Sequence, residues 1–439
     1  MTNRRKFIKN AALVGAGLAM AGPAYSYRRI IGANARVNVA VFGTNSRGAG
    51  LSSTFAKTRN CLVTHIGDTD TQAITKGQNS VEQAGQQKPA GDQDFRRILA
   101  LNEVDAVVIA TPDHWHAPMA IMSLNAGKHV YVEKPCSHNP AEGEMLIAVQ
   151  RKHPNLKVQM GNQQRSSHSS NGIISEIHDG LIGRAYYAKS WYSNTRGSIG
   201  RGQAAAVPEW LDYDLWQGPA PRRPYKDNLI HYNWHWFWHW GTGEILNNAT
   251  HEVDVCRWAL QVDYPEKVSS NGGRYHFDDD WQAYDTQDVN WEYADGKMIN
   301  WEGKSCNGVS IYNRGRGAMI YGTEGAVLID RDGYIVYDKH NNILREGSEG
   351  GTSVSMDVRG GGTLDSNHSH NFIEAINGQA ELHSPIEEAN ISVTTCHLGN
   401  IAHRSGGTLE LDPTNGKPKS AAGQALWGRD YEPGWEPKV

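Results

Sequence analysis

The sequence predicts an α/β protein in which an N-terminal doubly wound parallel sheet is followed by an α+β domain with a large, mostly antiparallel open sheet. Strand-like and helix-like stretches alternate from Val37 to about Met160, which is typical of a parallel sheet with helices on both faces. Beyond Arg184, strand-like stretches are instead joined by acid–glycine turns, which are typical of antiparallel hairpins.

The first strand is expected at residues 37–42, which are apolar and rich in valine. A glycine-containing loop at 43–48 follows directly and leads into a helix. It matches a dinucleotide-binding fingerprint, except that Asn45 stands in place of the second glycine. Asparagine enters left-handed backbone conformations more readily than most residues, so the loop can still turn. The helix N-terminus would then offer free N–H groups to a pyrophosphate.

The second strand, expected at 62–66, leads to Asp68, which lies about 25 residues after Gly43. At this spacing a carboxylate accepts hydrogen bonds from the ribose hydroxyls of a dinucleotide and disfavours a 2′-phosphate. NAD is therefore the expected cofactor, and NADP is less favoured. Asp68 could alternatively cap the helix that follows it, or serve in both roles.

The alternation continues through a buried strand at 104–110, a helix at 118–126 and a strand at 129–132. Lys134 follows that last strand. Doubly wound sheets bind their ligands at the carboxyl ends of their strands, so Lys134 is a candidate site residue.

Later strands are expected at 184–191, 286–292, 298–301, 318–321, 326–329 and 334–337, with turns at Asp295-Gly296, Glu324-Gly325 and Asp332-Gly333. Helices are expected at 372–376 and 386–403. The tail after Pro413 is expected to form an extended arm that could reach another subunit.

An insertion-like stretch at 193–240 ends in a dense run of aromatic residues. Aromatic faces stack on sugar rings, so this run forms either a wall of a sugar pocket or packing against the sheet. His231, His235 and His239 would share one face if the run were helical, and that face could ligate a metal. No acidic H-E-x-x-H pattern supports such a site, and no metal is expected. His368 and His370 are further candidates for substrate contacts.

The first 35 residues resemble a twin-arginine export signal: Arg4-Arg5, then an apolar run at 11–21, then small residues that allow cleavage after Ser26 or Ala35. The run is shorter than the roughly 20 residues that a transmembrane helix needs. A periplasmic or secreted protein, exported folded with its cofactor retained, is therefore expected.

The net charge of −4 leaves no broad basic field for nucleic acid or an anionic membrane. The five cysteines lie far apart without a C-x-x-C pair, so mostly buried, reduced thiols are expected.

Several motifs together resemble the Gfo/Idh/MocA oxidoreductases, named for glucose–fructose oxidoreductase and inositol dehydrogenase. They are the loop at 42–48, the run at 110–116, Glu133-Lys134-Pro135, the stretch 241–254 and the turn at 321–325. The stretch 241–254 looks like the family's D-x-x-x-H motif with Asn247 in place of its acid. The resemblance spans roughly residues 36–410. It implies a Rossmann domain, a second domain built on an open sheet, an active site between them, and a homo-oligomer, either a dimer or a tetramer.

By this resemblance, Lys134 would hydrogen-bond the reacting hydroxyl and His251 would exchange its proton. A histidine, with an ordinary pKa of about 6.5, suits that exchange at neutral pH. A lysine ammonium stabilises a developing alkoxide. Asn247 can still form hydrogen bonds but carries no charge.

The predicted catalytic residues are Lys134, His251 and Asn247. The predicted cofactor-binding residues are Gly43, Asn45, Ser46, Arg47, Gly48, Asp68, Thr111, Pro112, His114, His116 and Glu133. The predicted substrate-binding residues are Lys134, Asn162, Arg165, Trp191, His235, Trp238 and His251. The expected domains are a signal peptide at 1–35, an NAD-binding Rossmann domain at 36–160, a substrate-binding domain at 161–410 and a C-terminal arm at 411–439.

Three functions follow as hypotheses. The first is an NAD-dependent oxidoreductase that transfers hydride at a hydroxyl or carbonyl of a sugar, glycoside or polyol, with its cofactor tightly bound. The second is an NAD-dependent glycosidase or lyase that works by transient oxidation and elimination, without net redox change. The third is a non-catalytic sugar-binding protein, which predicts no retained nucleotide.

Overall fold

A computed structural model of the chain describes residues 36–349 and 362–439, and over these residues the strands form two sheets. The predicted export signal at 1–35 lies outside the described residues. The first sheet has the order β3-β2-β1-β4-β5-β6 and is parallel throughout. The second has the order β14-β13-β12-β11-β7-β10-β9-β8-β15 and is antiparallel except where β7 pairs with β10. The predicted fold class is confirmed.

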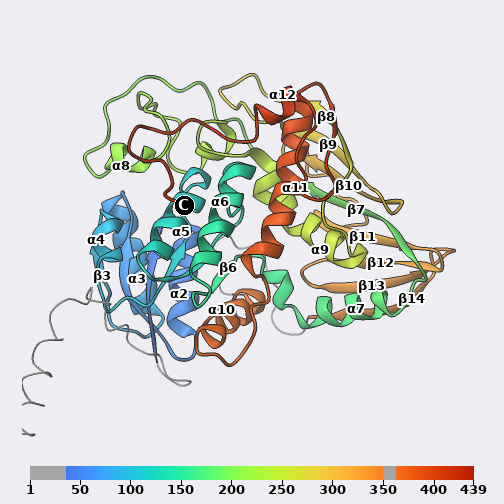
Figure 1. Ribbon diagram of the computed structural model, residues 1–439, viewed down its shortest axis with the longest axis horizontal. Coiled ribbons are helices and arrows are strands. Elements are labelled where there is room, and N and C mark those ends of the chain that lie inside the picture. Colours follow the sequence, from blue (N-terminus) through green and yellow to red (C-terminus); the bar gives the residue numbers. More distant parts are fainter. Residues whose placement is uncertain (1–35, 350–361) are drawn as a thin grey trace, which may run out of the picture. The chain divides into compact units, whose positions relative to one another are not determined.

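The first sheet and its helices follow one another in the predicted alternation (Figure 1). In order they are β1 (Val37–Phe42), α2 (Arg47–Lys57), β2 (Cys61–Gly67), α3 (Thr71–Gln83), β3 (Ala90–Asp92), α4 (Phe95–Leu99), β4 (Ala106–Ile109), α5 (Asp113–Asn125), β5 (His129–Val132), α6 (Pro140–Lys152) and β6 (Val158–Met160). Strand β4 is buried along its whole length, as its continuous apolar sequence predicts.

The second half contains η1 (Gln163–Ser166), α7 (His168–His178), β7 (Ala185–Ser193), α8 (Tyr213–Gln217), η2 (Asn233–Trp236), η3 (Ile245–Ala249), α9 (Thr250–Leu260), β8 (Lys267–Gly273), β9 (Thr286–Tyr293), β10 (Lys297–Lys304), β11 (Arg316–Gly322), β12 (Gly325–Ile329), β13 (Gly333–Asp338), β14 (Ile343–Ser348), α10 (Thr363–Ile376), α11 (Ile386–Arg404), β15 (Thr408–Glu410) and α12 (Ala421–Gln424). The three predicted acid–glycine turns join β9 to β10, β11 to β12 and β12 to β13, and each pair is antiparallel.

The two C-terminal helices connect the halves of the molecule. Helix α10 packs on α2, and α11 packs on α6 at one side and on β8 at the other (Figure 1). The Gln159 amide on β6 donates to the carbonyl of His368 on α10 at 3.0 Å. The second domain is thereby held against the nucleotide-binding half.

The C-terminal arm folds back onto its own chain, where the sequence had suggested an arm that could reach another subunit. In Figure 1 the chain ends beside α5. Arg429 forms an ion pair with the buried Glu142 on α6, and the Trp435 ring meets the Trp115 ring edge-on at 5.3 Å between centroids. The arm therefore covers part of the nucleotide-binding half.

The five cysteines are free, and four of them are buried, as expected from their spacing. Within residues 36–349 and 362–439, no helix has the length and apolar character needed to cross a membrane.

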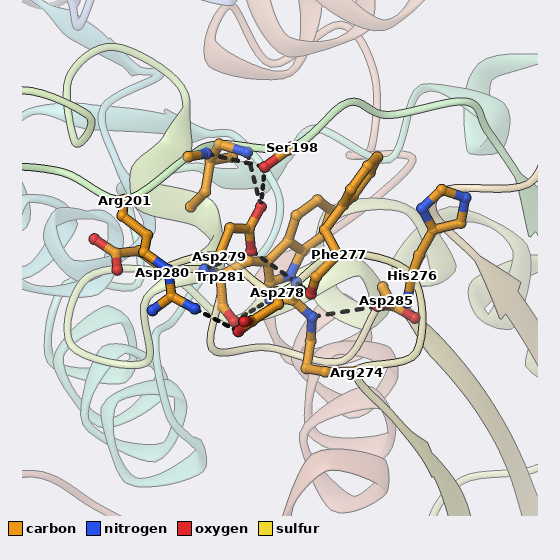
Figure 2. Close-up of polar contacts among 12 residues, drawn as sticks. Ser198, Arg201, Arg274, His276, Phe277, Asp278, Asp279, Asp280, Trp281 and Asp285 are labelled. Carbon is orange, nitrogen blue, oxygen red and sulfur yellow. Dashed lines mark hydrogen bonds and ion pairs between the residues drawn. The ribbon is translucent and has the colours of Figure 1, made fainter.

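The aromatic insertion, residues 193–240, is fixed at its start by a buried carboxylate, Asp279 (Figure 2). Asp279 accepts hydrogen bonds from the Ser198 hydroxyl at 2.7 Å and the Ile199 N–H at 2.9 Å, and it pairs with Arg274 at 2.8 Å. The Trp281 N–H also donates to Asp279, at 3.1 Å, so four donors meet on this one side chain. Asp279 therefore anchors the start of the insertion, next to further contacts such as that of Gly202 N–H with Asp280 at 3.0 Å.

Asp279→Ala is expected to release this loop. Hydrogen bonds to a charged group contribute about 1.5–3 kcal/mol each, so losing them should raise the open population about tenfold or more. Limited trypsin digestion would detect this as faster cleavage after Arg201. Asp278→Ala is the matched control, because the Asp278 side chain is 95% exposed and pairs only with Arg201. Equal cleavage rates in the two variants would contradict the prediction.

Candidate active site

A cavity of about 710 Å³ lies between the carboxyl ends of the first sheet's strands and the second domain. Its volume falls within the range of small-molecule sites, about 300–1,000 Å³. Its walls include most of the predicted site residues: Gly43, Asn45, Ser46, Arg47, Asp68, Thr111, Pro112, His116, Glu133, Lys134, His235, Asn247 and His251.

The loop between β1 and α2 forms a cradle that only glycine permits. Gly43 has φ +82°, and a Cβ on it would lie 2.6 Å from the carbonyl oxygen of Ala110. Gly48 packs against the Gly43 carbonyl, where a side chain has no room. Near this turn the buried Thr111 hydroxyl has no hydrogen-bond partner among the described residues. A close backbone approach at a helix N-terminus and an unpaired hydroxyl both fit a bound dinucleotide.

Asp68, at the end of β2, lines the same cavity. Its carboxylate accepts the N–H of Thr44 at 2.6 Å and that of Asp70 at 3.0 Å. Burial raises the pKa of Asp68 to about 6, although both backbone hydrogen bonds oppose the shift. Helix α3 is capped by Asp70, which accepts from Gln72 N–H, so Asp68 is not the cap. Asp68 lines the cavity, so a ribose hydroxyl bound there could reach its carboxylate.

Lys134 points across the cavity to the second domain. Its ammonium donates to the backbone carbonyl of Asn247 at 2.6 Å and to the Asn247 side-chain oxygen at 3.2 Å. Burial lowers the Lys134 pKa, while the carboxylates of Glu133 and Asp113 oppose the change. Asn247 lies in the π-helical turn Ile245–Ala249, just before α9. Such turns occur often at functional sites.

The amide of Asn247 joins Lys134 to a buried acid. Its Nδ2 donates to Glu244 at 3.2 Å, and the neighbouring Asn248 amide donates to the same oxygen. Glu244 also pairs with Arg196 at 2.7 Å, and the Glu244 pKa stays lowered despite burial because Arg196 holds it ionised. An aspartate at 247 would face Glu244 as a like charge. The neutral amide can instead donate to the acid and accept from the lysine.

His251, on α9, lines the cavity and is 6% exposed. Its pKa lies well below the ordinary value because it is buried, and because Arg331, Lys134 and Arg316 add positive charge nearby. The imidazole is therefore neutral at physiological pH, and a neutral imidazole can accept a proton.

Arg47 links both halves below the cavity. It donates to Glu133 at 2.9 Å and pairs with both carboxylate oxygens of Asp365 on α10, at 2.6 and 2.8 Å. Burial acts against the charge of Arg47, but the two acids outweigh it and raise the Arg47 pKa. Glu133 and the N-terminus of α2 are thus held in one arrangement.

The aromatic insertion contributes both a wall and packing. Tyr232, Trp234 and His235 line the cavity, and the Trp234 and His235 rings stack with their centroids 3.5 Å apart. Trp236 instead stacks on Trp281 at 4.0 Å, away from the cavity. Part of this aromatic run therefore forms a wall of the cavity, and another part packs in the interior.

The three histidines of the insertion do not share a helical face, because only Asn233–Trp236 forms a short 3-10 helix. His231 contacts Asp70 at 2.8 Å, His235 contacts the Tyr232 carbonyl at 2.6 Å and His239 contacts the Pro221 carbonyl at 2.7 Å. The suggested common metal-binding face is wrong. Among the described residues, no group of three or more His, Cys, Asp or Glu side chains could hold a metal ion.

Several predicted site residues do not line the cavity: Gly48, His114, Asn162, Arg165, Trp191 and Trp238, together with His368 and His370. His114 contacts the Trp216 carbonyl at 2.9 Å, and Arg165 pairs with Asp254 at 2.7 Å. The Trp191 indole is fully buried and donates to the Arg314 carbonyl. The Trp238 ring packs on Tyr284 and under the Arg404 guanidinium.

Charged residues that sequence reasoning missed complete the walls: Asp113, Arg196, Arg316, Arg331 and Asp365. Asp113 directly precedes His114 in the motif at 110–116 and could have been chosen by that proximity. The others stand outside any motif quoted above, and only the fold brings them to the cavity.

Two of the buried histidines predict a pH-dependent stability. Burial lowers the pKa of His368 and of His397 to about 4, whereas an unfolded histidine titrates near 6.5. Between these values the unfolded chain binds protons that the native state does not, so stability is lost as pH falls below about 6.5. Each of these histidines should lower the free energy of unfolding by roughly 1.4 kcal/mol for each pH unit that the pH falls within this window.

Urea unfolding at about pH 7, 6 and 5 would measure this slope. A His397→Gln variant keeps a donor for the Ser137 carbonyl, which His397 contacts at 3.1 Å, but removes one titrating group. Its stability should fall less steeply with pH. A slope as steep as that of the wild type would contradict the assignment.

Two family models match the chain. The "Oxidoreductase family, NAD-binding Rossmann fold" model matches residues 37–162, and the "Oxidoreductase family, C-terminal alpha/beta domain" model matches residues 188–329. Together they span more than half of the 439 residues. The chain belongs to the GFO/IDH/MocA oxidoreductase family, as its motifs had indicated.

A "Glycosyl hydrolase family 109 protein" of Saccharopolyspora erythraea is 29% identical over 209 residues, covering 43% of this chain and 45% of the relative. An "Alpha-N-acetylgalactosaminidase" of Shewanella oneidensis is 27% identical over 210 residues, covering 43% and 46%. The match thus spans less than half the length of these relatives. A solved levoglucosan dehydrogenase, in complex with NADH and levoglucosan, matches with TM-score 0.64 and 18% identity over 85% of this chain and 99% of its own. That likeness shows the fold alone.

Proposed function

We propose that this protein is an NAD-dependent oxidoreductase that acts on a carbon bearing a hydroxyl group in a sugar, glycoside or polyol. One observation carries the proposal: Lys134 from the nucleotide-binding half and His251 from the second domain line one cavity. When bound, the nicotinamide would supply the acceptor for a hydride from the carbinol carbon.

The chain's own residues account for the proton. The Lys134 ammonium, held by the two oxygen atoms of Asn247, donates a hydrogen bond to the substrate oxygen and stabilises the charge that develops there. His251, neutral because of burial and neighbouring cations, accepts the hydroxyl proton. The stacked pair Trp234–His235 offers a flat face to a sugar ring.

The nucleotide would be held by residues of the first half. Asn45, Ser46 and Arg47 lie at the N-terminus of α2, where a diphosphate binds, and Asp68 receives ribose hydroxyls. A 2′-phosphate beside the Asp68 carboxylate would meet a like charge, which favours NAD over NADP.

Contacts between the aromatic insertion and the nucleotide-binding half support a retained cofactor. Thr71 N–H donates to the Trp210 carbonyl at 3.0 Å, and Asp212 N–H donates to the Thr69 carbonyl at 2.9 Å. His231 contacts Asp70 at 2.8 Å. These contacts lie beside Asp68, so a bound nucleotide would leave only after they break. Retention also suits the proposed export through the twin-arginine route, because a periplasmic or secreted enzyme has no free nicotinamide pool.

A second candidate function is glycoside cleavage by transient oxidation and elimination, in which the hydride returns and no net redox change occurs. The names of the glycosyl hydrolase family 109 relatives favour it. Both candidates use the same Lys134–His251 site and differ in the fate of the substrate.

The test begins with the nucleotide that purified protein releases on denaturation, identified by mass. The protein is then mixed with a panel of free sugars and of nitrophenyl glycosides, while nicotinamide absorbance and nitrophenol release are both followed. A lasting absorbance change with free sugars supports hydride transfer. Nitrophenol release without lasting change supports the second candidate. Protein without nucleotide, unaffected by any sugar when NAD is added, would refute both.

A further inference from the structure

The turn between β12 and β13 brings a positive charge into the cavity. Arg331 lies in this turn and lines the cavity wall. Burial lowers the pKa of Arg331 to about 10 and the nearby Arg316 adds to this shift, while the acids Glu252 and Asp365 oppose it, so Arg331 remains charged at neutral pH. Among residues 36–349 and 362–439, no acceptor hydrogen-bonds to the Arg331 guanidinium and no acid forms an ion pair with it.

The other cations of the cavity have acceptors from the protein. Arg47 is paired with Glu133 and Asp365, as described above, and Arg196 with Glu244. Arg316 pairs with Glu252 at 2.6 Å and donates to the Asn248 side-chain oxygen at 3.2 Å. Lys134 is held by neutral oxygen atoms. Among the described residues, Arg331 is therefore the cavity-lining arginine whose guanidinium has no hydrogen-bond acceptor from the protein, although the acids Glu252 and Asp365 lie near enough to favour its charge.

The charge of Arg331 affects His251, the proposed proton acceptor. Burial lowers the pKa of His251 most, and the positive charge of Arg331 comes second, ahead of the charges of Lys134 and Arg316. Arg331 and His251 both line this cavity. An anionic group bound by Arg331 would sit on the same substrate as the hydroxyl that faces His251.

Arg331 is partly buried, and a cation drawn partly out of water gains from an anionic partner. A guanidinium matches a carboxylate with two parallel hydrogen bonds. We propose that the substrate of this site carries a carboxylate that Arg331 binds, with Arg316 beside it adding positive potential. The substrate class is then a sugar acid or a glycoside of a hexuronic acid. This inference rests on the proposed function, because it places its ligand in the same cavity.

The experiment measures ligand binding to purified protein with whatever nucleotide it retains. Calorimetric titration compares matched pairs: methyl hexosides and the corresponding methyl hexuronides of the gluco, galacto and manno series, with hexose 6-phosphates as a third arm. Wild type should bind at least one hexuronide about tenfold or more tighter than its neutral partner. Arg331→Gln should remove that difference and leave the neutral sugar's affinity unchanged. Arg331→Lys, which keeps the charge but not the two parallel donors, should restore part of it.

Arg345→Gln is the matched control, because Arg345 is half-exposed on β14 and pairs with Glu176 away from the cavity. It should retain the full preference for acids. The proposal is overturned if wild type binds no hexuronide more tightly than its hexoside, or if the hexose 6-phosphates bind tighter still. It is also overturned if Arg331→Gln sheds its nucleotide and weakens neutral and acidic sugars alike, since Arg331 would then serve the cofactor's phosphates.

Binding separates this inference from the proposed function. An arginine-dependent preference for hexuronides without any hydride transfer would sustain the carboxylate site and refute the oxidoreductase. Hydride transfer to sugars by a wild-type protein that binds no hexuronide more tightly than its hexoside would sustain the oxidoreductase and refute the carboxylate site.

Discussion

Lys134→Ala should lower the turnover of any substrate of this site by about 10²- to 10⁴-fold, which is the range for losing a general acid–base group or a donor to a developing oxyanion. The ammonium is held at 2.6 Å from the Asn247 carbonyl, so it is already in position before substrate binds. Removing it leaves the substrate oxygen without its cationic donor. The measurement is kcat/KM on the substrate found in the panel, with the nucleotide content determined in parallel.

The nucleotide should stay bound in this variant, because the cradle at Gly43 and the acid at Asp68 are untouched. Lys339→Ala is the control: Lys339 lies on the surface, where it pairs with Glu324, and its loss should change neither quantity. A Lys134→Ala protein with wild-type turnover would remove the central element of the mechanism.

Gly43→Ala should yield protein without bound nucleotide. The new Cβ would stand 2.6 Å from the Ala110 carbonyl oxygen, against backbone that cannot rotate away, and φ +82° is unfavourable for alanine. The end of β1 or of β4 must shift, and both ends border the cavity. We expect a loss of about 2–4 kcal/mol in unfolding free energy and little nucleotide on denaturation.

Gly85→Ala provides a matched comparison. Gly85 also has positive φ, +92°, but a Cβ there would meet nothing within 4 Å. The Gly85→Ala protein should lose about 1 kcal/mol of unfolding free energy from backbone strain alone and keep its nucleotide. If the two variants hold equal amounts of nucleotide, close packing at Gly43 is not what builds the cradle.

Elements with strong local signals were predictable from the sequence. An unbroken apolar run predicts the buried strand β4, and the Asp295-Gly296 turn predicts the hairpin β9–β10. Strand β8, by contrast, has the sequence of a loop, with Ser, Asn and Gly at most positions. It is a strand because β9 and β15 pair with it on either side. Such pairing, and above all that with the distant β15, leaves no signal in the local sequence of β8.

The site shows the same division. Lys134, Asn247 and His251 stand in recognisable motifs, and the structure brings them to one cavity. On β7, however, the substrate contact was assigned to Trp191, whereas its neighbour Tyr192 lines the cavity. Successive side chains of a strand point to opposite faces of the sheet. A prediction that is wrong by one residue therefore places a core side chain in the cavity. Which face is buried depends on what packs there, and for β7 that is decided by residues far away in sequence.

The parallel pairing of β7 with β10 has a consequence for biosynthesis. Strand β7 gains its neighbours only when Lys297–Lys304 and then Arg316–Gly322 have been made, since these are β10 and β11. Until then the nascent chain carries β7 with both edges open, and open edges recruit other chains. We therefore expect C-terminal truncations that stop before Lys304 to aggregate. A ribosome pause within the insertion would prolong this vulnerable interval.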